Sequence, residues 1–208
     1  MALFPDHLHD DAGQYAQAYF MQLAQAAGSV DPEAVAAAGR LLVETALAGG
    51  LIYACGNGGS AAIANHLVCD CMKGVRGDSS LAPRVVSLSS NIEIITAIAN
   101  DIGMDQIFSY QLQSLGKPGD VLIAISSSGA SPNILAALQE ARNRGVATIT
   151  MTGFSGGDAR NLADVNLHVD AQNYGVVEDT HQSLMHILAQ YMRHAHLHQP
   201  TKLGTLTF

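Results

Sequence analysis

Short, continuous runs of apolar residues alternate with longer Ala-rich or amphipathic stretches along most of this 208-residue chain. The runs lack polar alternation, which is typical of strands that are buried on both faces of a parallel sheet. A stretch with helical periodicity follows nearly every run, and this order indicates successive βαβ units. We therefore predict five strands, at residues 51–55, 84–88, 120–125, 146–152 and 165–169.

The helical stretches begin before the first predicted strand, at residues 11–27 and 31–49. Asp31 is a suitable N-cap for the second of them, and Pro32 suits its first position. Further helices are expected from the first strand through Lys73, at 92–100, 105–115 and 132–144, in a short piece after Gly156-Gly157, and at 177–194. The predicted fold is α/β, with a five-stranded parallel sheet flanked by helices and an N-terminal helical pair.

Length and composition favour a single domain with a sizeable core, because 208 residues with 48% apolar content can bury enough surface to fold as one unit. We divide it into N-terminal helices (1–49), an α/β core (50–194) and a tail (195–208). The tail has no clear periodicity, and we expect it to extend along the surface or along a neighbouring subunit.

Charge and cysteine content narrow the class of function. The net charge of −8, without any basic run, argues against nucleic acid or an anionic membrane as the main partner. No apolar stretch approaches the roughly 20 residues that span a bilayer, and no signal-peptide pattern opens the chain. The three cysteines are expected to be buried thiols. We expect a cytoplasmic protein.

Two polar loops carry the strongest chemical signal, because each lies between a predicted strand and a predicted helix. They are Gly56-Asn57-Gly58-Gly59-Ser60 and Ser126-Ser127-Ser128-Gly129-Ala130-Ser131. Unpaired N–H groups and the helix dipole favour an anion at a helix N-terminus, and ligands of such sheets bind at the carboxyl ends of strands. The loops therefore predict a phosphate site, although a capped turn without a ligand is the alternative for the serine loop.

Acidic and imidazole side chains form two further groups. His66 and Asp70 stand four residues apart and project from the same helix face. The last predicted helix contributes Glu178, His181 and His186. A metal ion or a substrate could contact such a set, whereas an ordinary polar residue on a helix surface is the alternative for each histidine.

Taken together, these segments resemble the sugar isomerase (SIS) family, and within it the phosphoheptose isomerases. The resemblance is carried by CGNGGSAAIANHLVCD at 55–70, the pair Asn100-Asp101, ISSSGASPNI at 125–134, TMTGFSGG at 150–157 and MHILAQ at 185–190. It implies a flavodoxin-like, three-layer SIS fold, assembled as a homotetramer with sites at subunit interfaces. The implied activity is aldose–ketose isomerisation of sedoheptulose 7-phosphate to D-glycero-D-manno-heptose 7-phosphate through an enediol, in heptose biosynthesis.

The resemblance also assigns residues to roles. Asp70 and His186 would be catalytic, and a divalent metal, zinc by preference, would be held by His66, Asp70, Glu178 and His186. The substrate would be bound by Asn57, Gly58, Gly59, Ser60, Asn100, Asp101, Ser126, Ser127, Ser128, Ser131 and Glu178. Two alternatives remain open, namely isomerisation of another ketose phosphate and a non-catalytic SIS protein that binds a sugar phosphate or a replication initiator.

Two of the proposed metal ligands depart from the family pattern, which has Glu in place of Asp70 and Gln in place of Glu178. The shorter Asp70 could displace a catalytic base by roughly 1 Å, whereas the added charge of Glu178 should strengthen the binding of a cation. Glu178 and His186 are eight residues apart, or about 12 Å along one straight helix. Either Glu178 precedes the regular helix or two subunits contribute the ligands.

Overall fold

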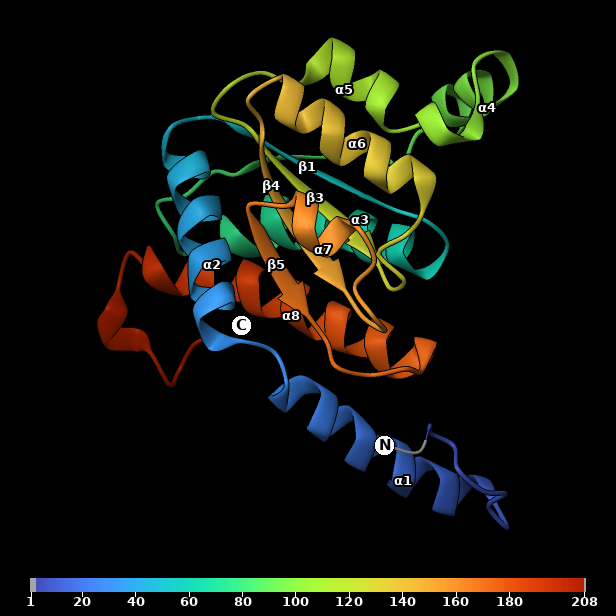
Figure 1. Ribbon diagram of the computed structural model, residues 1–208. Coiled ribbons are helices and arrows are strands. Elements are labelled where there is room, and N and C mark those ends of the chain that lie inside the picture. Colours follow the sequence, from blue (N-terminus) through green and yellow to red (C-terminus); the bar gives the residue numbers. More distant parts are fainter. Residues whose placement is uncertain (1–2, 208) are drawn as a thin grey trace.

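Five parallel strands form one sheet in the order β2-β1-β3-β4-β5, as Figure 1 shows in a computed structural model that describes residues 3–207. The strands are β1 (Leu51–Gly56), β2 (Arg84–Ser87), β3 (Val121–Ser126), β4 (Ala147–Thr152) and β5 (Val165–His168). β3 is buried along its whole length, which is why its sequence is apolar without alternation. The predicted number, type and positions of the strands are confirmed.

Eight α-helices are found in the described residues. They are α1 (Ala12–Gly28), α2 (Pro32–Leu47), α3 (Gly59–Cys69), α4 (Ile92–Asp101), α5 (Ser109–Leu115), α6 (Pro132–Asn143), α7 (Ala159–Leu162) and α8 (Tyr174–Ala195). A π-helical segment, Asp70–Val75, continues α3, and the short 3₁₀ helices are Met104–Gln106 and Pro200–Lys202. Asp31 caps α2 as predicted, since its carboxylate accepts from the Glu33 N–H.

Two boundaries differ from the sequence prediction for local reasons. The helix expected at 105–115 is divided, because a 3₁₀ turn precedes α5. The last helix begins at Tyr174 rather than at 177, because the side chain of Asn173 accepts a hydrogen bond from the Val176 N–H and caps the first turn. Glu178 therefore lies inside α8.

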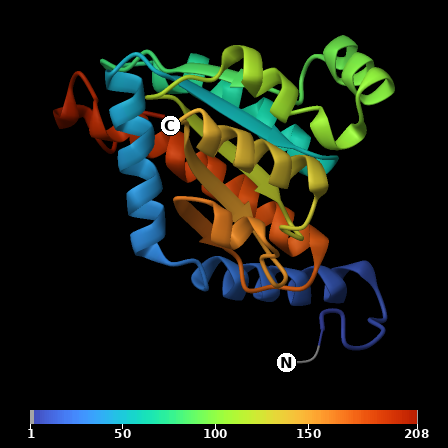
Figure 2. The same ribbon diagram turned by 45° about the horizontal axis from the view of Figure 1, so that its top comes forward.

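The sheet separates two hydrophobic clusters, so the molecule has three layers (Figure 2). One cluster combines α2, α3 and α8 with strand residues such as Ile52 and Ile123. The other combines α5, α6 and α7 with the alternate strand residues, such as Tyr53 and Leu122. The alternation of side chains along each strand distributes the apolar runs between both faces.

The N- and C-terminal segments pack on the layer that contains α8. α1 lies along α8, and the Tyr19 hydroxyl donates to the Asp179 carboxylate at 2.7 Å. Beyond α8, Leu197 forms an isolated antiparallel bridge with Ser79, and the His198 N–H donates to the Asp78 carbonyl oxygen at 2.9 Å. The segment after α8 thus extends along the surface of its own chain.

The strand order changes direction at β1, which has β2 on one side and β3 on the other. The helix after β1, α3, packs on one face of the sheet, whereas the helix after β3, α6, packs on the other. Because the two connections leave neighbouring strand ends in opposite directions, a crevice forms between them. This topology explains why the two polar loops lie side by side.

Candidate functional site

A small cavity of about 160 Å³ lies at the carboxyl ends of β1 and β3, between the two polar loops. Its lining residues are Asn57, Ser60, Ile125, Ser126, Ser127, Ser128, Ser131, Tyr174 and Glu178. Residues from both predicted loops are therefore brought together. Tyr174 and Glu178 come from the first turns of α8, so the last helix of the fold supplies one wall of the cavity.

The serine loop has donors without a protein partner. The buried Ser127 hydroxyl makes no hydrogen bond within residues 3–207. Ser131 occupies the N-cap position of α6 but makes no side-chain capping bond, and Ser126 Oγ lies 3.4 Å from Ser131 Oγ. An unpartnered Ser127 hydroxyl beside a helix N-terminus without a side-chain cap suits a phosphate, because phosphate oxygens accept from O–H and N–H groups alike.

Two asparagines join the polar loops directly. Asn57 Nδ2 donates to Asn133 Oδ1, and Asn133 Nδ2 donates to Asn57 Oδ1, both at 2.9 Å. Asn133 is buried in the first turn of α6. The sequence interpretation did not single out Asn133, although an asparagine inside a helix is an available signal, because that residue type favours caps and turns over helix interiors.

Gly59 allows Glu178 to approach the start of α3. A Cβ atom at Gly59 would lie only 2.5 Å from Glu178 Oε2, so the position tolerates no side chain while the carboxylate is there. The negative charge of Glu178 is stabilised by the positive end of the α3 dipole. Glu178 thus lies with the two loops, on the side of the crevice where α3 begins.

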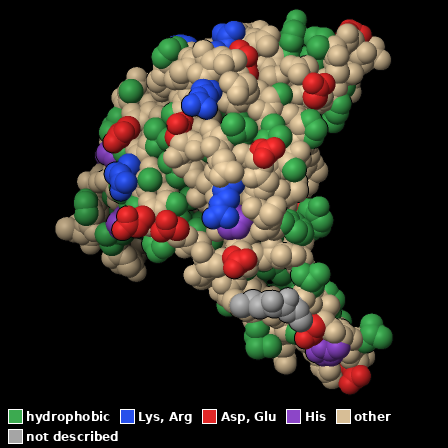
Figure 3. Space-filling view, in the orientation of Figure 1, with side chains coloured by type: hydrophobic (Ala, Val, Ile, Leu, Met, Phe, Trp, Pro, Cys, Tyr) green, Lys and Arg blue, Asp and Glu red, His purple; other side chains and the backbone are tan. Residues whose placement is uncertain are grey.

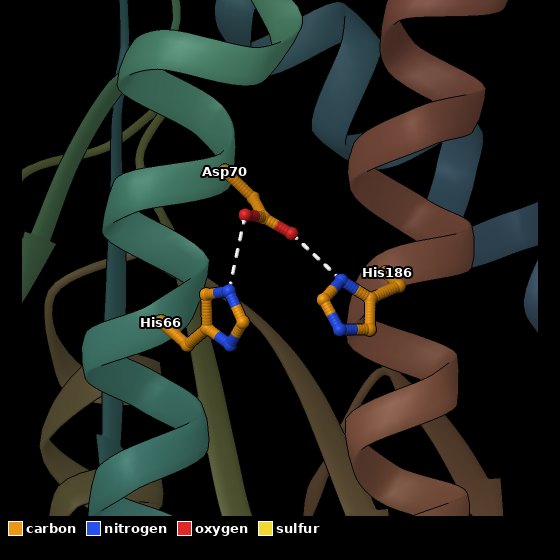
Figure 4. A group of neighbouring side chains, drawn as sticks. All are labelled: His66, Asp70 and His186. Carbon is orange, nitrogen blue, oxygen red and sulfur yellow. Dashed lines mark hydrogen bonds and ion pairs between the residues drawn. The ribbon is translucent and has the colours of Figure 1, made fainter. Parts of the chain in front are cut away.

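A second polar group lies further along α3 and α8 (Figure 4). Asp70 Oδ2 is 2.7 Å from His186 Nδ1, and Asp70 Oδ1 is 3.3 Å from His66 Nε2. The two imidazole rings are nearly perpendicular, with centroids 4.9 Å apart. Ligand atoms of these three residues lie within 4.8 Å of one another, and a carboxylate with two imidazoles fits a divalent transition metal such as zinc.

Gln182 lies between the same two histidines and was missed by the sequence interpretation. Its Nε2 is 3.1 Å from His66 Nδ1 and 3.0 Å from His186 Nε2. The available signal was spacing, because Gln182 precedes His186 by four residues and so shares its helix face. Glutamine was not considered because only acids and imidazoles were weighed as candidate ligands.

Glu178 is not part of this group in the described residues. Of the two alternatives drawn from the sequence, the one in which Glu178 precedes the regular helix is wrong, because α8 begins at Tyr174, and the other, a site shared by two subunits, stays a prediction. Glu178 and His186 are therefore separated by just over two helical turns, or about 12 Å along the axis. The structure places Glu178 in the cavity and His186 beside Asp70.

Asn100 and Asp101 are exposed at the end of α4, where Asn100 Nδ2 donates to Asp101 Oδ1 at 2.7 Å. Neither residue lines the cavity between the polar loops. Figure 1 shows α4 at a corner of the molecule, on the opposite side of the sheet from α8. Within one chain, the pair is not brought to the candidate site.

Charge on the surface agrees with the sequence interpretation. On the face drawn in Figure 3, Lys and Arg side chains are few and separated, and they form no basic patch there. Within residues 3–207, none of the helices is long and apolar enough to cross a membrane.

Known proteins show the same sequence and architecture. The SIS domain family matches residues 14–153. The phosphoheptose isomerase of Roseiflexus sp. (strain RS-1) is 39% identical over 159 residues, which cover 76% of this chain and 80% of the relative.

Two solved structures are similar over most of their length. The phosphoheptose isomerase of Neisseria gonorrhoeae superposes with a TM-score of 0.80 at 32% identity, covering 88% of this chain and 98% of that one. The enzyme from Francisella tularensis gives a TM-score of 0.81 at 30% identity, with coverage of 87% and 95%. Because the family match, the relatives and the five-stranded sheet agree, the chain belongs to the SIS domain family, in the group of the phosphoheptose isomerases.

Proposed function

We propose that this chain is an aldose–ketose isomerase that converts sedoheptulose 7-phosphate to D-glycero-D-manno-heptose 7-phosphate through an enediol. One observation supports this proposal in a chain related to phosphoheptose isomerases. It is the separation between the cavity of the polar loops and the group of His66, Asp70 and His186. The cavity holds Glu178, and the histidine group lies two helical turns further along α8. An extended seven-carbon sugar phosphate is of comparable length, so its phosphate can occupy one site while its first carbons reach the other.

The serine loop is the proposed phosphate site. Ser126, Ser127, Ser128 and Ser131 offer hydroxyls, and the first turn of α6 offers N–H groups. Anchoring the phosphate in this way lets binding energy from a remote group position the reacting carbons. On the neighbouring loop, Asn57, Gly58, Gly59 and Ser60 would contact the sugar, together with Glu178 of α8.

The reaction moves a proton between C1 and C2 of the sugar. Asp70 and His186 are the proposed acid–base groups, because they lie 2.7 Å apart and can each hold a proton near the same carbons. A divalent cation, which we propose to be zinc held by His66, Asp70 and His186, would polarise the carbonyl oxygen and stabilise the charge of the enediolate. Glu178 faces the substrate in this proposal rather than the cation.

The assembly supplies the remaining substrate contacts. Because Asn100 and Asp101 are exposed at the end of α4, we propose that they reach the sugar of a neighbouring subunit in a homotetramer. We propose a cytoplasmic location, where a sugar phosphate is available. The chain would act as a single SIS domain, with residues 1–49 covering the core and residues 195–208 lying on its surface.

The first test follows sedoheptulose 7-phosphate by NMR with purified protein, with and without added zinc. We expect conversion to an aldoheptose phosphate that depends on metal, and we expect His186→Ala to abolish turnover while inorganic phosphate still binds. His194→Ala is the matched control, since His194 is exposed in the last turn of the same helix. Metal binding without conversion of this sugar would reject the heptose assignment, and undiminished turnover by His186→Ala would reject the acid–base role.

A further inference from the structure

Gln182, His66, His186 and Asp70 form a ring of polar contacts, made of three hydrogen bonds and the 3.3 Å contact between His66 Nε2 and Asp70 Oδ1. The Gln182 carboxamide nitrogen contacts His66 Nδ1 and His186 Nε2 at 3.1 and 3.0 Å. The opposite nitrogen of each ring faces an oxygen of Asp70, as drawn in Figure 4. Gln182 and Asp70 therefore hold the same two imidazoles from opposite edges.

With both imidazoles neutral, the donors and acceptors of this ring fit together in one way. An ionised carboxylate can only accept, so the His186 nitrogen that is hydrogen-bonded to Asp70 carries a proton, and the same arrangement in His66 suits its contact with Asp70. A neutral imidazole has one N–H, which leaves the far nitrogens, His66 Nδ1 and His186 Nε2, as acceptors. The NH₂ group of Gln182 has two hydrogens and can donate one to each of them. Every polar atom between the rings then has a partner.

Metal binding reverses these requirements. A cation held jointly with Asp70 needs lone pairs on the nitrogens that face Asp70, so the ring protons must lie on the far nitrogens. The NH₂ group of Gln182 would then meet two N–H donors. A half-turn of the carboxamide presents Oε1 instead, and that oxygen has two lone pairs that can accept from both rings.

We propose that Gln182 is a positioning residue of the metal centre, and that its carboxamide reverses between the metal-free and the metal-loaded state. In each state it fixes the tautomer and the orientation of His66 and His186 from the side opposite Asp70. Partners of this kind orient metal ligands and raise affinity even though they do not contact the ion. The inference rests on the metal centre of the proposed function and is independent of the sugar.

Metal affinity tests the role of the amide. Zinc affinity is measured by competition with a chelator for the wild type, Gln182→Met and Gln182→Glu. Gln182→Met has nearly the same length but cannot accept from two imidazoles, so we expect affinity to fall by about 10- to 100-fold. Gln182→Glu retains an accepting oxygen and should bind zinc at least as tightly as the wild type.

The matched control is Gln139→Met, the same exchange at an exposed position of α6, which should leave zinc affinity unchanged. Thermal unfolding of all variants establishes that they are folded. If Gln182→Met binds zinc as tightly as the wild type, the positioning role is wrong. If Gln182→Glu binds zinc as weakly as Gln182→Met, the reversal of the amide is wrong. An oxygen at position 182 that accepts hydrogen bonds from the two imidazoles would then contribute nothing to zinc affinity.

The tautomers give a second measurement that does not depend on affinity. In metal-free protein with ¹⁵N-labelled histidine, NMR should find the proton of His66 on Nε2 and that of His186 on Nδ1. Adding zinc should move both protons to the far nitrogens, and identical tautomers with and without zinc would overturn the inference. If the wild type does not bind zinc, both the metal centre and this inference are wrong. If it binds zinc with an affinity that does not change in the Gln182 variants, this inference alone is wrong and the proposed function is unaffected.

Discussion

His181 is a buried titratable side chain that takes no part in the proposed chemistry. It lies on α8 where that helix packs against β4, it is fully buried, and neither ring nitrogen has a hydrogen-bond partner in the described residues. Burial, opposed in part by the backbone of Thr152 and assisted by the nearby His168, lowers the pKa of His181 to about 4 from an ordinary value of 6.5. The neutral ring is therefore the form that fits the fold.

This shift predicts acid sensitivity. Between pH 6.5 and pH 4 the unfolded chain binds a proton at His181 that the folded chain does not bind. The free energy of unfolding should therefore fall as the pH falls through this window, by about 3 kcal/mol from this residue. Denaturant unfolding at several pH values should show a shallower dependence for His181→Leu than for the wild type.

The control for this comparison is His194→Leu, since His194 is exposed on the same helix and should leave the dependence on pH unchanged. An unaltered dependence in His181→Leu would mean that other groups cause the acid sensitivity.

At the scale of elements, the pair Asn57 and Asn133 couples the loop before α3 to the first turn of α6. Removing one amide leaves the other with unpaired donor and acceptor atoms at the edge of the cavity. We expect Asn133→Ala to lower the free energy of unfolding by about 1 kcal/mol. We also expect KM for the sugar phosphate to rise about tenfold, with a smaller change in kcat. The two loops would lose the hydrogen bonds that fix their positions relative to each other.

Steady-state kinetics with Asn143→Ala as control test this coupling, since Asn143 is exposed at the other end of α6. A KM that stays at the wild-type value in Asn133→Ala would show that each loop holds its shape alone.

The elements could be predicted from sequence to the extent that local patterns determine them. The apolar run of β3 and the Asp31 cap of α2 depend on neighbouring residues, and both were predicted correctly. The contacts of Asn133 and Gln182 depend on how α6 and α8 approach other elements, which no local pattern records. The start of α8 at Tyr174 rather than at 177 was missed because the cap at Asn173 adds residues that the apolar pattern does not show.

At the scale of the whole molecule, α1 and α4 expose apolar side chains at two separate corners. Phe20 and Met21 of α1 are 64% and 68% exposed, and Ile92 of α4 is 61% exposed. Isolated apolar side chains are ordinary on a surface, but helices that present several of them favour contact with other subunits. These helices are therefore the surfaces that we assign to the proposed tetramer.

Light scattering on the purified protein should give four times the mass of one chain. We expect Phe20→Asp and Ile92→Asp to give smaller assemblies, because burying an unpaired carboxylate at an interface is costly. Leu47→Asp makes the same change at an exposed position of α2 and should keep the native mass. A monomeric wild type would also remove the proposed role of Asn100 and Asp101.

The group of His66, Asp70 and His186 joins helical segments from distant parts of the chain, since Asp70 and His186 lie 116 residues apart. A growing polypeptide folds from its N-terminus as it leaves the ribosome. α3 is therefore made long before α8 exists, and during that interval His66 and Asp70 would offer only two of the three proposed ligands. Tight binding of the proposed metal would have to follow the synthesis of all five strands, so only a nearly complete chain would hold the ion.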